Sequence, residues 1–149
     1  AVELSLACDL RYAATHVTMQ MPEASWGGFP GAGAPVRLPL LVGKARALEL
    51  ICTAREIDSV EMNQLGLVQG VHPQASLKDA VAKIAQTIAD NGPLAVRGAK
   101  RIMAARQEPG TRAARELSDA LRHALEWSLD VNEGMTAHKE SRKPNFVGR

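Results

Sequence analysis

Short strand-forming segments are concentrated in the first 72 residues of the chain, and this uneven distribution constrains the fold more than any other feature. Strands are predicted at residues 9–13, 17–21 and 67–71, and little strand is expected after them. A parallel sheet needs several strands joined by helical crossovers, so a complete α/β domain would contain more strands than these. The sequence therefore predicts an α/β fold whose other sheet partners lie on the N-terminal side of Ala1.

The rest of the sequence predicts helices. Asp58 or Ser59 is expected to cap a helix that Gly66 stops, and Ser76 is expected to cap a helix at residues 77–89. The other predicted helices cover residues 1–8, a segment ending near 42, 44–53, 94–106, 111–131 and 132–139.

The nearly balanced charge of the chain argues against a nucleic-acid partner. The chain has 18 basic and 16 acidic residues, a formal net charge of +2, and its basic residues are mostly scattered. The densest basic region is typical of a solvated tail and contains Lys139, Arg142, Lys143 and Arg149. No apolar run approaches the roughly 20 residues that a membrane span needs. We therefore expect neither a nucleic acid nor a membrane as a partner.

The two cysteines, Cys8 and Cys52, lie in apolar surroundings and form no CxxC motif. They are expected to be buried free thiols, which fits a reducing compartment. We therefore predict a cytoplasmic location. Because the chain begins without Met, a targeting segment before Ala1 stays an open alternative.

A glycine-rich stretch at residues 26–35, which ends in proline, is the most unusual local feature. So many residues that tolerate uncommon backbone angles indicate a backbone close to a ligand or to packed chain. Glu23 stands at the entry of this stretch, and Glu3 is the other acid of the first half in apolar surroundings. Two carboxylates that converge on a pocket would suit general acid–base chemistry. The alternative is that each is a solvated or capping glutamate.

Other functional motifs are not supported by their spacing. Gly31 and Gly33 do not form a dinucleotide-binding fingerprint, because Val36 stands where its third glycine would fall. The four histidines lack the spacing of metal ligands, so no metal site is predicted. Trp26 and Phe29 either wall a hydrophobic slot or pack in the core.

Several segments, in order along the chain, resemble the crotonase superfamily. The first runs from Glu3 to Ala13 and is similar to the segment that follows a glycine-rich turn in that superfamily. The likeness continues through residues 21–23, 27–33, 37–39, 42–50, 57–58, 65–68, 133–135 and 142–149. The chain thus resembles the C-terminal part of an enoyl-CoA hydratase/isomerase over essentially its whole length.

This resemblance implies a crotonase-like (ClpP/crotonase) superhelix of ββα turns. Residues 1–72 would be the C-terminal part of the crotonase core, with the active-site segments, and residues 73–149 a helical region that supports trimer formation. A homotrimer or homohexamer is expected. The superfamily binds acyl-CoA thioesters through two backbone N–H groups, and both would precede Ala1. No cofactor is implied, because coenzyme A is part of the substrate.

In hydratases of this superfamily two glutamates flank the reacting double bond, and Glu3 and Glu23 stand at their positions. By this likeness Glu3 activates the water that attacks C3, Glu23 supplies the proton to C2, and Gly31 helps to hold the water. Trp26 and Phe29 are expected beside the substrate. The implied activity is that of an enoyl-CoA hydratase, a lyase of fatty-acid or related acyl-CoA metabolism. The alternatives are an enoyl-CoA isomerase or another crotonase reaction, and a catalytically silent fragment or assembly subunit.

Overall fold

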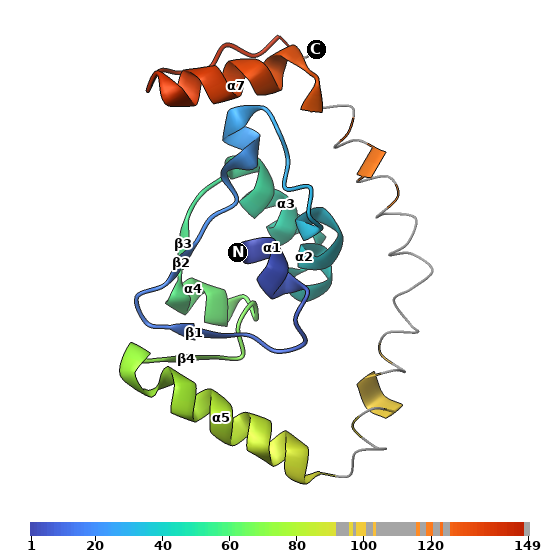
Figure 1. Ribbon diagram of the computed structural model, residues 1–149, viewed down its shortest axis with the longest axis vertical. Coiled ribbons are helices and arrows are strands. Elements are labelled where there is room, and N and C mark those ends of the chain that lie inside the picture. The colour runs from blue at the N-terminus through green and yellow to red at the C-terminus, as the bar shows by residue number, and fades with distance from the viewer. Residues whose placement is uncertain are drawn as a thin grey trace.

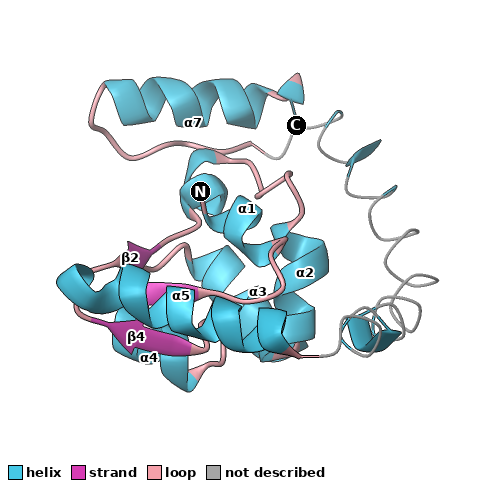
Figure 2. Ribbon diagram, turned by 60° about the horizontal axis from the view of Figure 1, so that its bottom comes forward, coloured by secondary structure: helices cyan, strands magenta, loops and turns pink. Residues whose placement is uncertain are grey.

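The computed structural model describes residues 1–91, 96, 98–100, 103, 116, 119–120, 123 and 126–147. Among them α5 and α7 lie on opposite sides of a body that the other elements form (Figures 1 and 2). The elements in chain order are α1 (Val2–Leu6), β1 (Tyr12–Ala14), β2 (Thr18–Met19), the 3-10 helix η1 (Pro22–Trp26), α2 (Ala34–Val42), α3 (Lys44–Thr53), β3 (Ile57–Asp58), α4 (Ser59–Gln64), β4 (Gly70–His72), α5 (Gln74–Asp90) and α7 (Leu129–Lys139).

The strands form two small pairs, which confirms the predicted mixture of helix and strand. β1 pairs in parallel with β4, with Tyr12 opposite Gly70. β2 pairs antiparallel to β3, with Met19 opposite Ile57. Both pairs join the segment after α1 to the segment around α4. None of the described residues after β4 forms a strand, as the sequence predicts.

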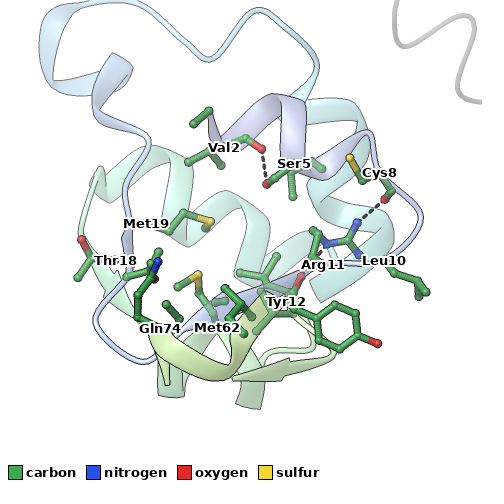
Figure 3. A pocket seen from close by; sticks show the side chains of 18 residues that line it. Val2, Ser5, Cys8, Leu10, Arg11, Tyr12, Thr18, Met19, Met62 and Gln74 are labelled. Atoms are coloured by element: carbon green, nitrogen blue, oxygen red, sulfur yellow. Dashed lines mark hydrogen bonds between the residues drawn. The ribbon is translucent and has the colours of Figure 1, made fainter. Parts of the chain in front are cut away.

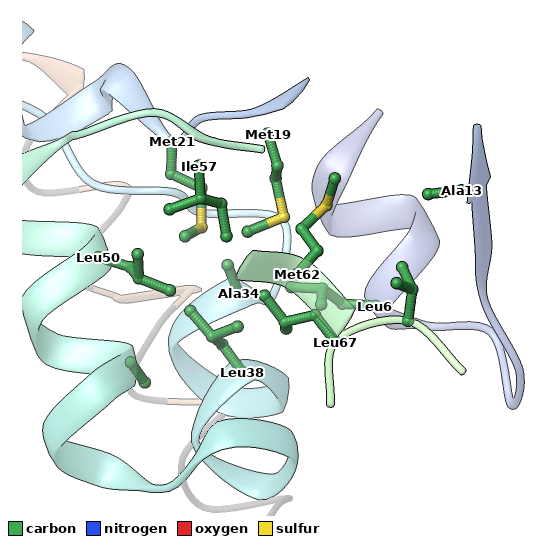
Figure 4. Close-up of a cluster of buried hydrophobic side chains, with 12 residues drawn as sticks. Leu6, Ala13, Met19, Met21, Ala34, Leu38, Leu50, Ile57, Met62 and Leu67 are labelled. Carbon is green, nitrogen blue, oxygen red and sulfur yellow. The ribbon is translucent and has the colours of Figure 1, made fainter. Parts of the chain in front are cut away.

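One apolar core joins α1 to the helix pair α2 and α3 and to the strands (Figure 4). Leu38 of α2 and Leu50 of α3 are almost completely buried in it. Burying a side chain of this size contributes about 1.5–3 kcal/mol relative to leaving it exposed. The core therefore fixes α2 beneath the loop that connects it to η1. Its buried members are Leu6, Ala13, Met19, Met21, Ala34, Leu38, Ala47, Leu50, Ile57, Met62, Leu67 and Val68.

The predicted helices between residues 34 and 66 are confirmed. α2 and α3 meet at Gly43, as expected from the sequence. Asp58 caps α4, because its Oδ1 accepts a hydrogen bond from the N–H of Glu61 at 2.8 Å. The helix ends just before Gly66.

Several predicted boundaries are wrong, among them the start of the first strand, which lies at Tyr12 and not at Asp9. β4 begins at Gly70 because the preceding residues of the predicted strand turn back on α4, where the Leu67 N–H donates to the Met62 carbonyl at 2.9 Å. α5 begins directly after a proline, so Ser76 lies inside its first turn instead of capping it. α7 begins at Leu129 and not at residue 132, because Ser128 is its N-cap residue. The helix predicted at 111–131 therefore does not continue unbroken to residue 131. The rest of that helix and the helix at 94–106 lie largely outside the described residues.

Both cysteines are exposed, contrary to the prediction that they are buried. Cys8 follows α1, and its thiol donates to the Leu4 carbonyl at 3.7 Å. Cys52 lies two residues after Leu50 in α3, and two residues rotate a helix by about 200°, so Cys52 faces away from the core. Burial therefore gives no support to a reducing compartment, and the cytoplasmic location stays a prediction.

α5 packs against β1 and β4 with only part of its predicted apolar face. Val81 and Ile84 are half-buried, whereas Ala85 and Ile88 are exposed, and no residue of α5 is fully buried. No helix in the described part of the chain is both long and apolar enough to cross a membrane.

Candidate active site

The carboxylate of Glu3 lies at the N-terminal end of α2. Glu3 is in the first turn of α1, and its Oε1 accepts a hydrogen bond from the N–H of Ala34 at 2.9 Å. The first N–H groups of a helix have no intrahelical partner and carry partial positive charge, so they hold a carboxylate well. This bond joins residues 31 apart in the sequence and fixes the direction of the Glu3 side chain.

The backbone before α2 leaves the N–H of Ala34 available for this contact. Gly33 is the N-cap residue and has a φ of 118°, a conformation that residues with a Cβ rarely adopt. Pro35 follows in the first turn, where its missing N–H removes no helical hydrogen bond. No side chain of the cap itself bonds to the start of α2, so the Glu3 carboxylate takes that place.

Glu23 lies in η1, and one of its two carboxylate oxygens is in an unusual environment. Its Oε2 is buried and has no hydrogen-bond partner among the described residues. An unpaired buried polar atom costs about 1–3 kcal/mol, so native proteins rarely keep one without a reason. The backbone of the turn is well tied, because the Glu23 carbonyl accepts a hydrogen bond from the Gly28 N–H at 2.9 Å.

The two carboxylates mark the two ends of one loop, residues 27–33. Glu23 precedes the loop on η1, and Glu3 bonds to the first residue of the helix that follows it. No hydrogen bond joins the two carboxylates to each other in the described part of the chain. Phe29 and Gly31 are half-buried within the loop. The structure thus brings both predicted catalytic residues to the same loop, with the predicted water-binding glycine between them.

Trp26 lies at the end of η1 and is not a core residue. Its side chain is 38% exposed, and its ring lies 5.2 Å from the ring of His138 in α7, centroid to centroid, at an interplanar angle of 51°. This exposure contradicts the predicted core role of Trp26, and its role as the wall of a hydrophobic slot stays a prediction. His138 forms part of no metal site, since no metal-binding group of His, Cys, Asp or Glu occurs among the described residues.

A cavity of about 460 Å³ lies between α1, β1, β2 and the start of α5 (Figure 3). Val2 and Ser5 of α1 line one side of it, and Met19 and Met62 line the other. Its size suits a small ligand, and most of its lining is apolar. However, it contains none of the predicted site residues Glu3, Glu23, Trp26, Phe29 and Gly31. We therefore place the candidate chemistry at the carboxylates and not in this cavity.

A surface cluster of charged side chains joins α3 and α4, apart from both carboxylates. The Arg55 guanidinium donates hydrogen bonds to Glu49 and Glu61 and lowers the pKa of both carboxyl groups. The same bonds raise the pKa of Arg55. This cluster ties the two helices together and is not part of the candidate site.

The sequence analysis missed the contact between the C-terminal segment and η1. α7 packs on η1, and the backbone of Gly134 lies directly against the carbonyl of Trp26. One signal was present in the sequence, because Gly134 lies inside a predicted helix. Glycine costs about 1 kcal/mol there relative to alanine, so its presence indicates close packing.

Comparison with known proteins shows the family to which the chain is similar. The family model described as "Enoyl-CoA hydratase/isomerase" matches residues 1–149. Crotonyl-CoA hydratase of Syntrophomonas wolfei is 40% identical over 149 residues, which cover 99% of this chain and 56% of that protein. Human enoyl-CoA hydratase domain-containing protein 2, mitochondrial, is 38% identical over 160 residues, 99% of this chain and 52% of that protein. The chain spans about half the length of the curated relatives it matches.

Solved structures are similar over the same extent. An enoyl-CoA hydratase/isomerase from Pseudoalteromonas atlantica superposes with a TM-score of 0.91 at 28% identity, over 98% of this chain and 59% of the other. A methylmalonyl CoA decarboxylase superposes with a TM-score of 0.81 at 31% identity, over 100% of this chain and 59% of the other. One fold therefore accommodates reactions of more than one type.

Proposed function

Because this chain belongs to the enoyl-CoA hydratase/isomerase family and has the crotonase fold of its solved relatives, we propose that the protein is an enoyl-CoA hydratase. The predicted resemblance to the crotonase superfamily is confirmed by the same matches. The proposed reaction adds water across the double bond of a 2-trans-enoyl-CoA. The hydroxyl group goes to C3 and a proton goes to C2, which gives a 3-hydroxyacyl-CoA.

The observation that carries the proposal is the placement of two carboxylates at the ends of one loop in different environments. Glu3 is held by the N–H of Ala34, so its free oxygen can orient and deprotonate the attacking water. Glu23 has a buried, unpaired oxygen that can carry the proton for C2. Gly31 lies between them in the loop and supplies a backbone N–H for the water. Trp26 and Phe29 flank the same turn and would contact the acyl group.

An isomerase is the second candidate, and a relative favours it. A protein of Mycosarcoma maydis that is 34% identical over 149 residues is named enoyl-CoA isomerase/hydratase. Double-bond migration needs a proton moved between two carbons and no attacking water, so one carboxylate is enough. The hydrogen bond that orients Glu3 favours hydration over isomerisation. Hydration uses a second oriented carboxylate to activate water, whereas isomerisation does not need one. A catalytically silent fragment or assembly subunit would need neither carboxylate.

The partners of the protein follow from the same proposal. Its substrate would be an acyl-CoA thioester, with no cofactor beyond the coenzyme A that the substrate brings. The helical region after residue 72 would support a homotrimer or homohexamer. The location proposed from the sequence is cytoplasmic, although some relatives are named mitochondrial.

The test replaces each carboxylate by its amide in the natural full-length protein. Glu3→Gln and Glu23→Gln should each lower the hydration rate of crotonyl-CoA by about 100-fold or more, the usual scale for a general acid or base. Glu56→Gln is the matched control, because Glu56 is an exposed acid between α3 and β3. An isomerase would lose double-bond migration in Glu23→Gln and keep it in Glu3→Gln. Turnover near that of the wild type in either variant would refute the assigned roles.

A further inference from the structure

The end of η1 that follows Glu23 is held by residues near the C-terminus. A Cβ atom placed on Gly27 would lie 2.7 Å from the carbonyl oxygen of Asp130 and 2.9 Å from Cε1 of Phe146. A Cβ atom on Gly134 would overlap the carbonyl group of Trp26. Three residues of the C-terminal segment therefore touch the last two positions of the turn, with no space left for an added methyl group.

A second set of bonds fixes the segment that makes these contacts. After α7 the chain folds back beneath the helix (Figure 2). Glu133 accepts two hydrogen bonds from the Arg142 guanidinium, at 2.6 and 2.9 Å, and one from the N–H of Asn145 at 2.8 Å. The N–H of Val147 donates to Asp130 at 2.7 Å. These bonds hold Phe146 against the turn.

We propose that these residues, Asp130, Glu133, Gly134, Arg142 and Phe146, form a tail clamp that positions Glu23 for proton transfer. The clamp acts on Trp26 and Gly27, which end the turn that carries Glu23. The side chain of Glu23 has no hydrogen bond to orient its buried oxygen within the described part of the chain. The direction of that carboxylate therefore depends on the backbone of the turn. α3 packs against η1 as well, and the clamp is what holds the end of the turn at Trp26 and Gly27.

The clamp contrasts with the anchoring of the other carboxylate. Glu3 is oriented by its own hydrogen bond to α2, inside the first part of the chain. Within the described part of the chain, Glu23 is oriented through its backbone, which is held locally by the Gly28 N–H, by α3, and by residues more than 100 positions further along the chain. The Arg142 guanidinium and the Asn145 N–H lower the pKa of Glu133 to about 2, so the clamp keeps its charge throughout the pH range of an enzyme assay. The clamp residues touch no reacting atom and are positioning residues.

The experiment rests on the proposed function and uses the natural full-length protein with crotonyl-CoA. Gly134→Ala introduces the overlap with Trp26, and Glu133→Gln removes the charge that holds the tail. Both should lower kcat on the order of 10- to 100-fold, the cost of a misplaced catalytic group, with KM changed by about twofold or less. Gly98→Ala and Glu140→Gln are the matched controls. Gly98 has open space around it, and Glu140 accepts one hydrogen bond from Arg142, whereas Glu133 accepts two from Arg142 and one from Asn145.

Combination with Glu23→Gln separates positioning from a general loss of structure. If the clamp acts through Glu23, adding Gly134→Ala to Glu23→Gln should cost about twofold or less. The same cost in both backgrounds would overturn the proposal. Should Gly134→Ala fail to fold, Glu133→Gln is combined with Glu23→Gln in the same way. The stoichiometry of thioester binding gives the active fraction of each preparation.

Different results would refute the tail clamp and the proposed hydratase function. Wild-type turnover in Glu23→Gln alone would remove Glu23 from the reaction and with it the proposed function. A large loss in Glu23→Gln, together with wild-type turnover in Gly134→Ala and Glu133→Gln, would overturn only the tail clamp.

Discussion

Replacement of Arg11 by methionine should destabilise the protein much more than the same change at the surface. Arg11 is only 9% exposed, and its Nε–H donates to the buried Leu67 carbonyl at 2.7 Å. Its Nη1 donates to the carbonyl of Cys8. These bonds connect the turn after α1 to the turn before β4. Methionine replaces the apolar stem of arginine but leaves both carbonyl groups without these donors.

The magnitude follows from the two bonds. A hydrogen bond from a charged donor contributes about 1.5–3 kcal/mol, and a buried acceptor left unpaired costs about 1–3 kcal/mol. The Leu67 carbonyl is buried, whereas the contact with Cys8 is only partly buried. We therefore expect Arg11→Met to lower the free energy of unfolding by about 2–4 kcal/mol.

Urea denaturation of the natural full-length protein at a fixed protein concentration would measure this loss. Arg37→Met is the control, because within the described part of the chain the Arg37 side chain donates one exposed hydrogen bond, to the Ala32 carbonyl at 3.1 Å. Its cost should be about 0.5 kcal/mol or less. Equal shifts of the urea midpoint in the two variants, at an unchanged slope, would refute the argument from burial.

Three further predictions concern charge, assembly and the extent of the chain. Arg55 lowers the pKa of Glu49 and Glu61, so the stability they contribute is present above the usual carboxyl pKa and is lost as the pH falls through the lowered values. Arg55→Gln should therefore shift the urea midpoint more at about pH 7 than at about pH 3. Light scattering should show a trimer or a dimer of trimers for the full-length protein, and a stable active monomer would contradict this. Residues 1–149, which span about half the length of the curated relatives, should not hydrate crotonyl-CoA when expressed alone, because the family likeness implies oxyanion donors outside these residues and the loss of one donor costs about 10²–10³ in rate. Equal hydration rates for residues 1–149 alone and for the full-length protein would contradict this prediction.

Local sequence signals were enough to predict the middle of the fold. Gly43 and Gly66 each follow a helix, and Asp58 has the short acidic side chain that caps the next one. Each signal acts within about four residues along the chain, so it is visible without knowledge of the fold. The family resemblance was likewise visible, because its motifs follow one another in order.

Features that depend on distant partners could not be predicted in this way. Cys52 has apolar neighbours in sequence, but its side of α3 is decided by which face meets the core. The bond between Glu3 and Ala34 depends on how α1 and α2 pack, and the sequence shows only that Glu3 has apolar neighbours. The tail clamp joins residues near position 27 to residues after position 129, and only Gly134 gave a sign of it.

The separate anchoring of the two carboxylates has a consequence for how the site responds to change. Glu3 is tied to α2, whose buried residues Ala34 and Leu38 belong to the core, so its position has the stability of the core itself. Glu23 lies in a 3-10 turn with no buried residue, and contacts near the C-terminus hold the end of that turn. Segments with few buried contacts open at lower free energy than the core. Loosening of the C-terminal segment should therefore disturb proton transfer at Glu23 while the contact of Glu3 with α2 stays intact.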